Sequence, residues 1–271
     1  MKRKSYFLVI ILAIILIVIG YGMQYYYAPP KEREPYAIEK NNDDTIRVAY
    51  IGDSWAFFHK PYDQRISDSL TTKLNHPATV SSIGFCGRSS KEVYWYLFDN
   101  PELVSFISKG YDYCIISLGI NDANKKMSAN YYKQSMAYII QFMLANQITP
   151  IILEIPDYDI EKMYRWEIPS RKLLRPFSRF ITGTPINCKT EFRQALDALL
   201  AEKKYGDRVQ VIRYQTWNNH YAEDLKNLYK GDGIHLNEKG YTRLDSCIVD
   251  ICVKLRNIAS NENDRVQEKR I

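Results

Sequence analysis

The sequence carries a small set of side chains that could transfer an acyl group. Ser54 ends an apolar run in RVAYIGDSWAFF, residues 47–58, and a serine hydroxyl becomes a good nucleophile only when a base removes its proton. His235 could be that base, because an imidazole can exchange a proton near neutral pH. Asp232, three residues earlier, could hold the other ring N–H and stabilise the imidazolium. These residue types indicate acyl transfer through a serine nucleophile.

Such a reaction also needs hydrogen-bond donors for the negative oxygen of its tetrahedral intermediate. The backbone N–H groups of Ser54 and Gly87 and the side-chain amide of Asn121 could supply three. Taken singly, each residue has an ordinary alternative, since Gly-Asp-Ser is a common turn and Asn121 could cap a helix or form an Asx turn. Four polar stretches, at residues 52–54, 84–90, 119–122 and 231–241, follow one another on one strand pattern, and together they favour the catalytic interpretation.

The elements that must position these residues alternate along the chain. Apolar runs predict strands at residues 45–52, 78–85, 111–119, 149–156 and 208–215. Helical spacing lies between or after them, at residues 64–75, 90–109, 129–147, 190–204 and 237–258. This alternation predicts an α/β fold with a five-stranded parallel sheet covered by helices on both faces. Ligands of such sheets bind at the carboxyl ends of the strands, where all four polar stretches fall.

The N-terminal segment predicts a membrane helix. Lys2, Arg3 and Lys4 precede a run from Phe7 to Met23 that has no charged residue, and at 1.5 Å per residue this run would be about 26 Å long. We expect residues 1–23 to be an uncleaved transmembrane anchor, with a cleaved signal peptide as the alternative. The basic head should remain cytoplasmic, so the rest of the chain would lie outside, in the periplasm or beyond the cell. The tyrosines at 25–27 could then form an aromatic belt at the outer interface.

The remaining chain reads as a linker, one domain and a short tail. Residues 24–44 are rich in Pro and charge and predict the linker, residues 45–260 the domain, and residues 261–271 a polar tail. Residues 157–189 are basic and aromatic without clear periodicity, and predict a long loop inserted beside the active face. The basic head carries half of the net charge of +6, so the domain is too weakly basic to indicate nucleic-acid binding.

Other polar residues carry weaker predictions. Arg88 could bind a substrate carboxylate or form a surface ion pair, and the sequence leaves both open. His59, His76 and His220 have no carboxylate at a suggestive spacing in these stretches and are expected to pack or lie on the surface. The 5 cysteines are an odd number, so an exported domain would keep at least one free thiol.

The four stretches resemble the conserved blocks of the SGNH hydrolases, also called the GDSL esterase/lipase family. The resemblance covers residues from about Thr45 to Ile258 and implies a three-layer, flavodoxin-like α/β/α fold without a cofactor or metal. It makes Ser54 the nucleophile, Gly87 and Asn121 oxyanion-hole residues, and Asp232 and His235 the remaining pair of the triad. CGRSS, which contains Gly87, is similar to the Gly-Arg-Ser version in family acetylesterases that act on pectin side chains.

We therefore expect a membrane-anchored serine esterase that removes an O-acetyl or other short acyl group from a cell-envelope or extracellular carbohydrate. A lipid acyl esterase or lysophospholipase, or an O-acyltransferase, could use the same machinery. A catalytically silent glycan-binding protein is the alternative from another class. The oligomeric state is not predicted.

Overall fold

The protein is described by a computed structural model that covers residues 2–165 and 169–268. Its centre is a five-stranded sheet in the order β2-β1-β3-β4-β5, and all four strand pairs are parallel. The strands are β1 (Ile46–Gly52), β2 (Ala78–Gly84), β3 (Tyr113–Ser117), β4 (Thr149–Leu153) and β5 (Gln210–Ile212). The predicted fold is confirmed, and the order reverses between β1 and β3, where flavodoxin-like sheets bind ligands.

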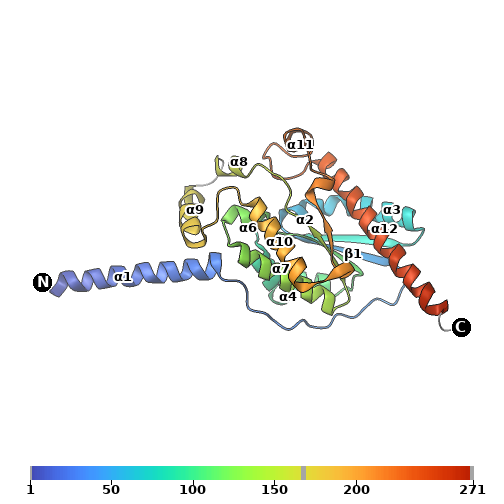
Figure 1. The fold of residues 1–271 in the computed structure, drawn as a ribbon, viewed down its shortest axis with the longest axis horizontal. Coiled ribbons are helices and arrows are strands. Elements are labelled where there is room, and N and C mark those ends of the chain that lie inside the picture. The colour runs from blue at the N-terminus through green and yellow to red at the C-terminus, as the bar shows by residue number, and fades with distance from the viewer. Residues whose placement is uncertain (1, 166–168, 269–271) are drawn as a thin grey trace.

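Helices cover both faces of this sheet (Figure 1). The helices between the strands include α2 (Ser54–His59), α3 (Asp63–Leu74), α4 (Ser90–Asp99), α5 (Pro101–Ile107), α6 (Ile120–Lys125), α7 (Ala129–Ala145) and α10 (Lys189–Lys203). After β5 follow α11 (Tyr221–Asn227) and α12 (Glu238–Glu268). Helix α12 packs on α3, whereas α7 packs between α4 and α10. All residues of β3 are buried, as expected of a parallel strand covered on both sides.

The predicted helix at residues 90–109 is two helices. Asn100 has an extended backbone, and its side chain accepts hydrogen bonds from the N–H groups of Glu102 and Leu103, both at 3.0 Å. Pro101 takes the first position of α5, where its missing N–H costs nothing, while the residue before a proline is disfavoured in a helix. The chain therefore breaks at Asn100 and starts again.

The predicted loop at residues 157–189 contains two helices, so that prediction was wrong in its secondary structure. They are α8 (Ile160–Arg165) and α9 (Pro169–Thr182), and α9 has Pro176 inside it. A proline inside a helix removes one backbone hydrogen bond and usually argues against a helix, which is why no helix was predicted at α9. At the other end, α12 runs to Glu268 and includes most of the predicted tail.

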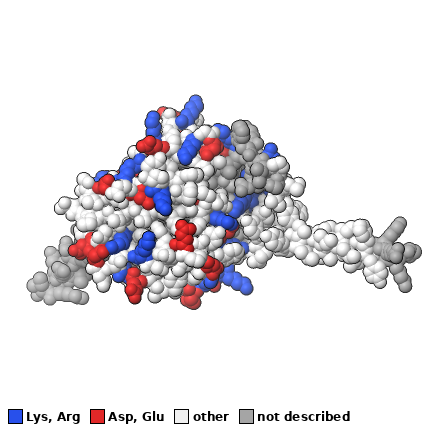
Figure 2. All heavy atoms as spheres, turned by 180° about the vertical axis from the view of Figure 1, so that it is seen from behind, with Lys and Arg blue, Asp and Glu red and all other residues white. Residues whose placement is uncertain are grey.

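The N-terminal segment forms a projecting helix. Helix α1 (Lys2–Gly22) continues into a π-helical turn, η1 (Met23–Tyr27). Among the described residues one segment, Tyr6–Tyr27, is long and apolar enough to cross a bilayer, as a membrane anchor or a signal sequence can. Figure 2 shows this projection without coloured charges outside its grey end, whereas both signs are interspersed over the visible face of the domain.

The segment predicted as a linker is bound to the domain. The ammonium group of Lys91, a buried residue, donates to the carbonyl oxygens of Gln24 at 3.0 Å and Ala28 at 2.9 Å. Ser128 donates to two carbonyls between these, from its backbone N–H to Tyr26 at 2.9 Å and from its hydroxyl to Tyr27 at 3.0 Å. The end of the apolar helix is thereby fixed against α4 and α7.

Candidate active site

Ser54 is the first residue of α2, which is separated from β1 by Asp53 alone. The chain can turn there because Gly52 lies against β3: a Cβ at this position would stand 2.3 Å from the carbonyl oxygen of Ser117. Asp53 caps α2, and its carboxylate accepts a hydrogen bond from the N–H of Trp55 at 3.0 Å. The Ser54 N–H therefore occupies the first helical position, which has no intrahelical acceptor.

His235 lies beside Ser54 although the two are far apart in sequence. Its Nε2 is 2.9 Å from the Ser54 hydroxyl oxygen, and its Nδ1 is 2.7 Å from an oxygen of Asp232. The other Asp232 oxygen accepts the backbone N–H groups of Ile234 at 2.9 Å and His235 at 3.0 Å. Gly233 has a φ of +74°, which glycine adopts readily, and this turn brings the carboxylate back to the ring.

The charge of Asp232 determines which nitrogen of the His235 imidazole carries the proton. Partial burial acts to raise the pKa of Asp232, but the hydrogen bonds from the His235 ring and two backbone N–H groups lower it overall. An ionised carboxylate can only accept hydrogen bonds. The His235 Nδ1 therefore donates to Asp232, which leaves Nε2 free to accept the Ser54 hydroxyl proton.

Trp55 joins the loop of Ser54 to the loop of His235. Its buried indole N–H donates to the carbonyl oxygen of Ile234 at 3.2 Å, and its own carbonyl accepts the hydroxyl of Tyr241 at 3.1 Å. The ring of Phe58 packs edge-on against the imidazole, with centroids 5.0 Å apart. The relative position of the two loops is thus fixed by contacts of Trp55 and Phe58, which follow Ser54 in α2.

Asn121 lies in the first turn of α6 and faces Asp53. Its amide nitrogen donates to a carboxylate oxygen of Asp53 at 3.1 Å. The helix cap is Gly119 rather than Asn121, so the alternative of a capping asparagine is wrong. Gly119 has a φ of +114°, and a Cβ there would lie 2.6 Å from Ile155. The turn after β3 therefore depends on glycine and turns Asn121 toward the end of β1.

Asp53 is fully buried behind the nucleophile. Burial raises its pKa to about 7, and the negative charge of nearby Asp122 adds to the effect. Asp122 is also buried, which raises its pKa to about 6, and it accepts the N–H of Ser90 at 2.9 Å and the Ser90 hydroxyl at 2.5 Å. Asp122 thus ties α6 to α4.

Gly84 is the last residue of β2, and Gly87 lies in the turn that follows it. Gly87 has a φ of +75° and open space where a Cβ would be, and no hydrogen-bond acceptor for its N–H is found among the described residues. A Cβ on Gly84 would lie 2.1 Å from the backbone nitrogen of Phe57. Gly84 is therefore required for packing, whereas Gly87 presents an available donor.

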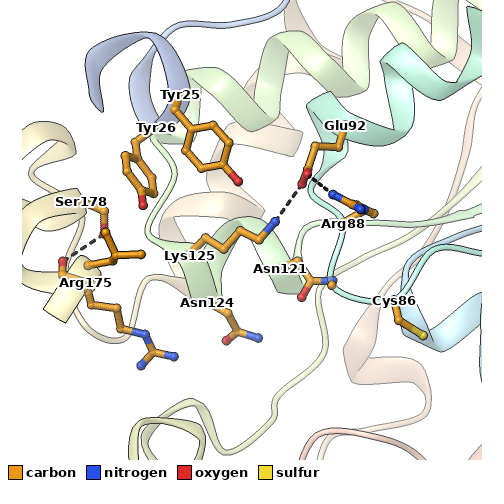
Figure 3. Close-up of a pocket in the computed structure, with 12 residues that line it drawn as sticks. Tyr25, Tyr26, Cys86, Arg88, Glu92, Asn121, Asn124, Lys125, Arg175 and Ser178 are labelled. Carbon is orange, nitrogen blue, oxygen red and sulfur yellow. Dashed lines mark hydrogen bonds and ion pairs between the residues drawn. The ribbon is translucent and has the colours of Figure 1, made fainter. Parts of the chain in front are cut away.

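A pocket of about 430 Å³ is lined in part by Gly87 and Asn121, and Figure 3 labels Asn121 in its wall. Its remaining lining residues are Tyr25, Tyr26, Cys86, Arg88, Glu92, Asn124, Lys125, Leu174, Arg175 and Ser178. Arg88 pairs with Glu92 at 2.9 Å and Lys125 pairs with the same carboxylate at 2.8 Å. Of the two roles left open for Arg88, the structure shows the ion pair, at the wall of the pocket.

Two walls of this pocket were missed or only partly foreseen. Tyr25 and Tyr26 come from η1 and point into it (Figure 3), although the sequence suggested a membrane belt for these tyrosines. Leu174, Arg175 and Ser178 come from α9, which agrees with an insertion beside the active face. No sequence signal marks the tyrosines, because η1 is held through its backbone carbonyls.

The other predicted polar residues lie outside this site. His59 is buried between Asp245 at 2.9 Å and Asp63 at 3.1 Å; burial acts to lower its pKa, but these two carboxylates raise it overall. It is a packing residue, as expected. All five cysteines are free. Among the described residues, no group of three or more His, Cys, Asp or Glu side chains could hold a metal ion.

Comparisons with known proteins agree on the fold. The lipase/acylhydrolase from Enterococcus faecalis matches with a TM-score of 0.53 at 15% identity, over 77% of this chain and 96% of its own. Axe2, an acetylxylan esterase from Geobacillus stearothermophilus, matches with a TM-score of 0.51 at 14% identity, over 76% of this chain and 93% of its own. The acetyl xylan esterase AlAXEase matches with a TM-score of 0.54 at 17% identity, over 76% of this chain and 99% of its own. A comparison with curated protein sequences found no match.

The family assignment comes from the sequence itself. Residues 50–243 match the model of the GDSL-like lipase/acylhydrolase family. This range includes Ser54, Gly87, Asn121, Asp232 and His235 and ends inside α12. The chain therefore belongs to the GDSL-like lipase/acylhydrolase family and is an ester-hydrolysing enzyme.

Proposed function

We propose that this enzyme is a serine esterase that removes an O-acetyl or similarly short acyl group from a carbohydrate, with Ser54, His235 and Asp232 as its triad. The observation that carries the proposal is the unbroken chain from the Ser54 hydroxyl through the imidazole to Asp232, at 2.9 and 2.7 Å. The side chains of His235 and Asp232 are 24% and 44% exposed, so a substrate can reach them.

In this mechanism, the Ser54 oxygen forms a bond to the ester carbonyl carbon while its proton passes to His235 Nε2. Asp232 stabilises the resulting imidazolium. When the tetrahedral intermediate collapses, the carbon–oxygen bond to the alcohol breaks and that oxygen takes the proton from Nε2. Water then repeats the sequence on the acyl-enzyme and releases the acid, with His235 again the base.

The oxyanion hole of the proposal consists of the N–H groups of Ser54 and Gly87 and the amide of Asn121. The N–H groups of Ser54 and Gly87 are available because Ser54 begins a helix and Gly87 lies in an open turn. The third is aimed by Asp53, which takes one of the two amide hydrogens. The loss of one such donor typically costs about 2.7–4 kcal/mol in the transition state.

Three observations support a short acyl group on a carbohydrate. Two of the proteins with similar folds are acetyl xylan esterases. The Gly87–Arg88–Ser89 turn adjoins the pocket, and the pocket carries tyrosines and hydrogen-bonding groups of the kind that bind sugars.

The proposal further makes α1 a membrane anchor with Lys2, Arg3 and Lys4 on the cytoplasmic side, so that the catalytic domain lies outside the cytoplasm.

A second candidate is a lipid acyl esterase. It is favoured by the position of Tyr25 and Tyr26, which end the apolar segment Tyr6–Tyr27 and also line the pocket. A lipid ester in the same membrane would be within reach of this pocket. An acyltransferase is chemically related, because a sugar hydroxyl could replace water in the second half of the reaction.

Hydrolysis of p-nitrophenyl esters by the full chain in detergent tests the proposal. We expect kcat/KM to be highest for acetate and at least tenfold lower for palmitate, with no activity in Ser54→Ala. A preference for palmitate would instead support the lipid candidate. Transfer of acetyl to an added oligosaccharide in preference to water would show an acyltransferase. No turnover of any ester, with glycan binding retained in Ser54→Ala, would indicate a silent binding protein.

A further inference from the structure

Helix α9 exposes a row of large apolar side chains. Leu173 and Phe180 are 79% and 77% exposed, far more than any other large apolar side chain described outside α1. Their spacing of seven residues places them on one face of the helix, together with the half-buried Phe177 between them. A row of this kind normally marks an interaction surface.

The opposite face of α9 is fixed to the domain. Arg175 and Ser178 are buried and line the pocket. At the end of the helix, the hydroxyl of Thr182 donates to the carbonyl of Lys126 at 3.0 Å, and Thr184 donates to the carbonyl of Met127 at 3.0 Å. The exposure of Leu173 and Phe180 is thus imposed by how α9 is held.

The apolar row lies next to the end of the apolar helix α1. A Cβ on Gly22 would stand 2.7 Å from the ring of Phe177 and 3.3 Å from Ile181, so the two helices approach closely at this glycine. The rings of Tyr26 and Phe177 meet edge to face, with centroids 6.4 Å apart. Figure 1 shows α9 beside the point where α1 reaches the domain. The apolar surface of α1 therefore continues onto α9.

The charges of α9 also suit a membrane surface. The helix contains no Asp or Glu, and Lys172 and Arg179 are exposed. Helices that lie in a bilayer interface combine an apolar face with Lys and Arg at its border, where these contact anionic lipid headgroups.

We propose that α9 is seated in the outer headgroup region of the bilayer that α1 crosses, with Leu173, Phe177 and Phe180 facing the acyl chains. The inference rests on the anchor role proposed for α1. Its consequence concerns the active site, because the inner face of α9 and the tyrosines of η1 form walls of the same pocket. The pocket is then held at the membrane surface, and the ester substrates it meets are those presented there.

The test is the depth of a fluorescent label in nanodiscs that hold one full chain each. Cys86, which is exposed, and the half-buried Cys247 are first replaced by Ser, and NBD is attached to a cysteine introduced by Leu173→Cys or Phe180→Cys. Lys73→Cys, at the end of α3, is the exposed control. Leu12→Cys, within α1, reports the anchor. We expect lipids with a doxyl group near the headgroup to quench positions 173 and 180 at least threefold more than position 73.

Each other outcome contradicts a different step. If position 12 is quenched by lipids with a deep doxyl group but 173 and 180 behave like 73, the anchor is real and the docking of α9 is wrong. If 173 and 180 become shielded without being quenched, protein rather than lipid covers them, and the proposal also fails. If position 12 is not quenched, the anchor fails and the inference fails with it; ester hydrolysis, which is measured separately, is unaffected by that result.

Discussion

The amide nitrogen of Asn121 donates a hydrogen bond to the buried carboxylate of Asp53, at 3.1 Å. Asp53 adjoins the proposed nucleophile, whereas Asn121 belongs to the turn after another strand. When Asp53 is ionised it only accepts hydrogen bonds, so in that state the nitrogen of Asn121 must face it. One carboxylate thus caps the helix of Ser54 and orients a proposed oxyanion donor.

The first prediction concerns this donor. Asn121→Ala should lower kcat for p-nitrophenyl acetate by about 10²–10³ with little change in KM, because the lost hydrogen bond acts mainly in the transition state. Asn124→Ala, which removes an amide from the same helix, should lower kcat by less than about tenfold. A change confined to KM in Asn121→Ala would argue against an oxyanion role.

The second prediction concerns stability and pH. The pKa of Asp53 is raised to about 7 and that of Asp122 to about 6, whereas an aspartate in an unfolded chain titrates near 3.9. Between these values the folded state binds more protons than the unfolded state. The contribution of these two carboxyls to the free energy of unfolding is therefore fully present below about pH 4 and decreases as the pH rises toward 7, by up to about 1.4 kcal/mol per pH unit for each group.

Asp53→Asn isolates the contribution of Asp53. Asparagine keeps an oxygen for the Trp55 N–H but cannot ionise, so the variant should lose less stability than the wild type between pH 5 and about 7. Thermal unfolding of both proteins in the same detergent, followed across this range, provides the comparison. Parallel curves for the two proteins would show that Asp53 does not titrate there.

The third prediction compares two buried tryptophans whose rings touch, with centroids 5.8 Å apart. Trp55 donates to the carbonyl of Ile234, next to His235, whereas the indole N–H of Trp217 has no hydrogen-bond partner among the described residues. Replacing either by Phe removes the same volume. Trp55→Phe should also misplace the His235 loop and lower kcat by about ten- to a hundredfold.

Trp217→Phe is the matched control for this prediction. It should lower the unfolding temperature by a similar amount but leave kcat nearly unchanged. Equal values of kcat in the two variants would mean that the hydrogen bond to Ile234 does not position the imidazole.

Much of the fold could be predicted because parallel strands covered on both faces are short apolar runs bounded by polar residues. The site could be located for a related reason: Ser54, Gly87 and Asn121 all follow such runs, at one edge of the sheet. The break at Asn100 was also present in the sequence, as an Asn-Pro pair, but helical spacing on both sides of it favoured one long helix.

Other features could not be predicted. Lys91 holds Gln24 and Ala28 through carbonyl oxygens, which every residue possesses, so no residue type marks this contact. The apolar row of α9 faces outward, away from the protein core, and Pro176 interrupts the expected pattern of a helix. Leu173, Phe177 and Phe180 do have the spacing of one helix face, but the proline between them argued against a helix and the periodicity was missed.

The most direct test of the catalytic account is covalent labelling of the full chain with a fluorophosphonate, followed by mass-spectrometric mapping of the modified residue. The account predicts one modification, on Ser54, and a labelling rate at least a hundredfold lower in His235→Ala. Modification of another serine, or equally fast labelling of Ser54 without His235, would contradict it.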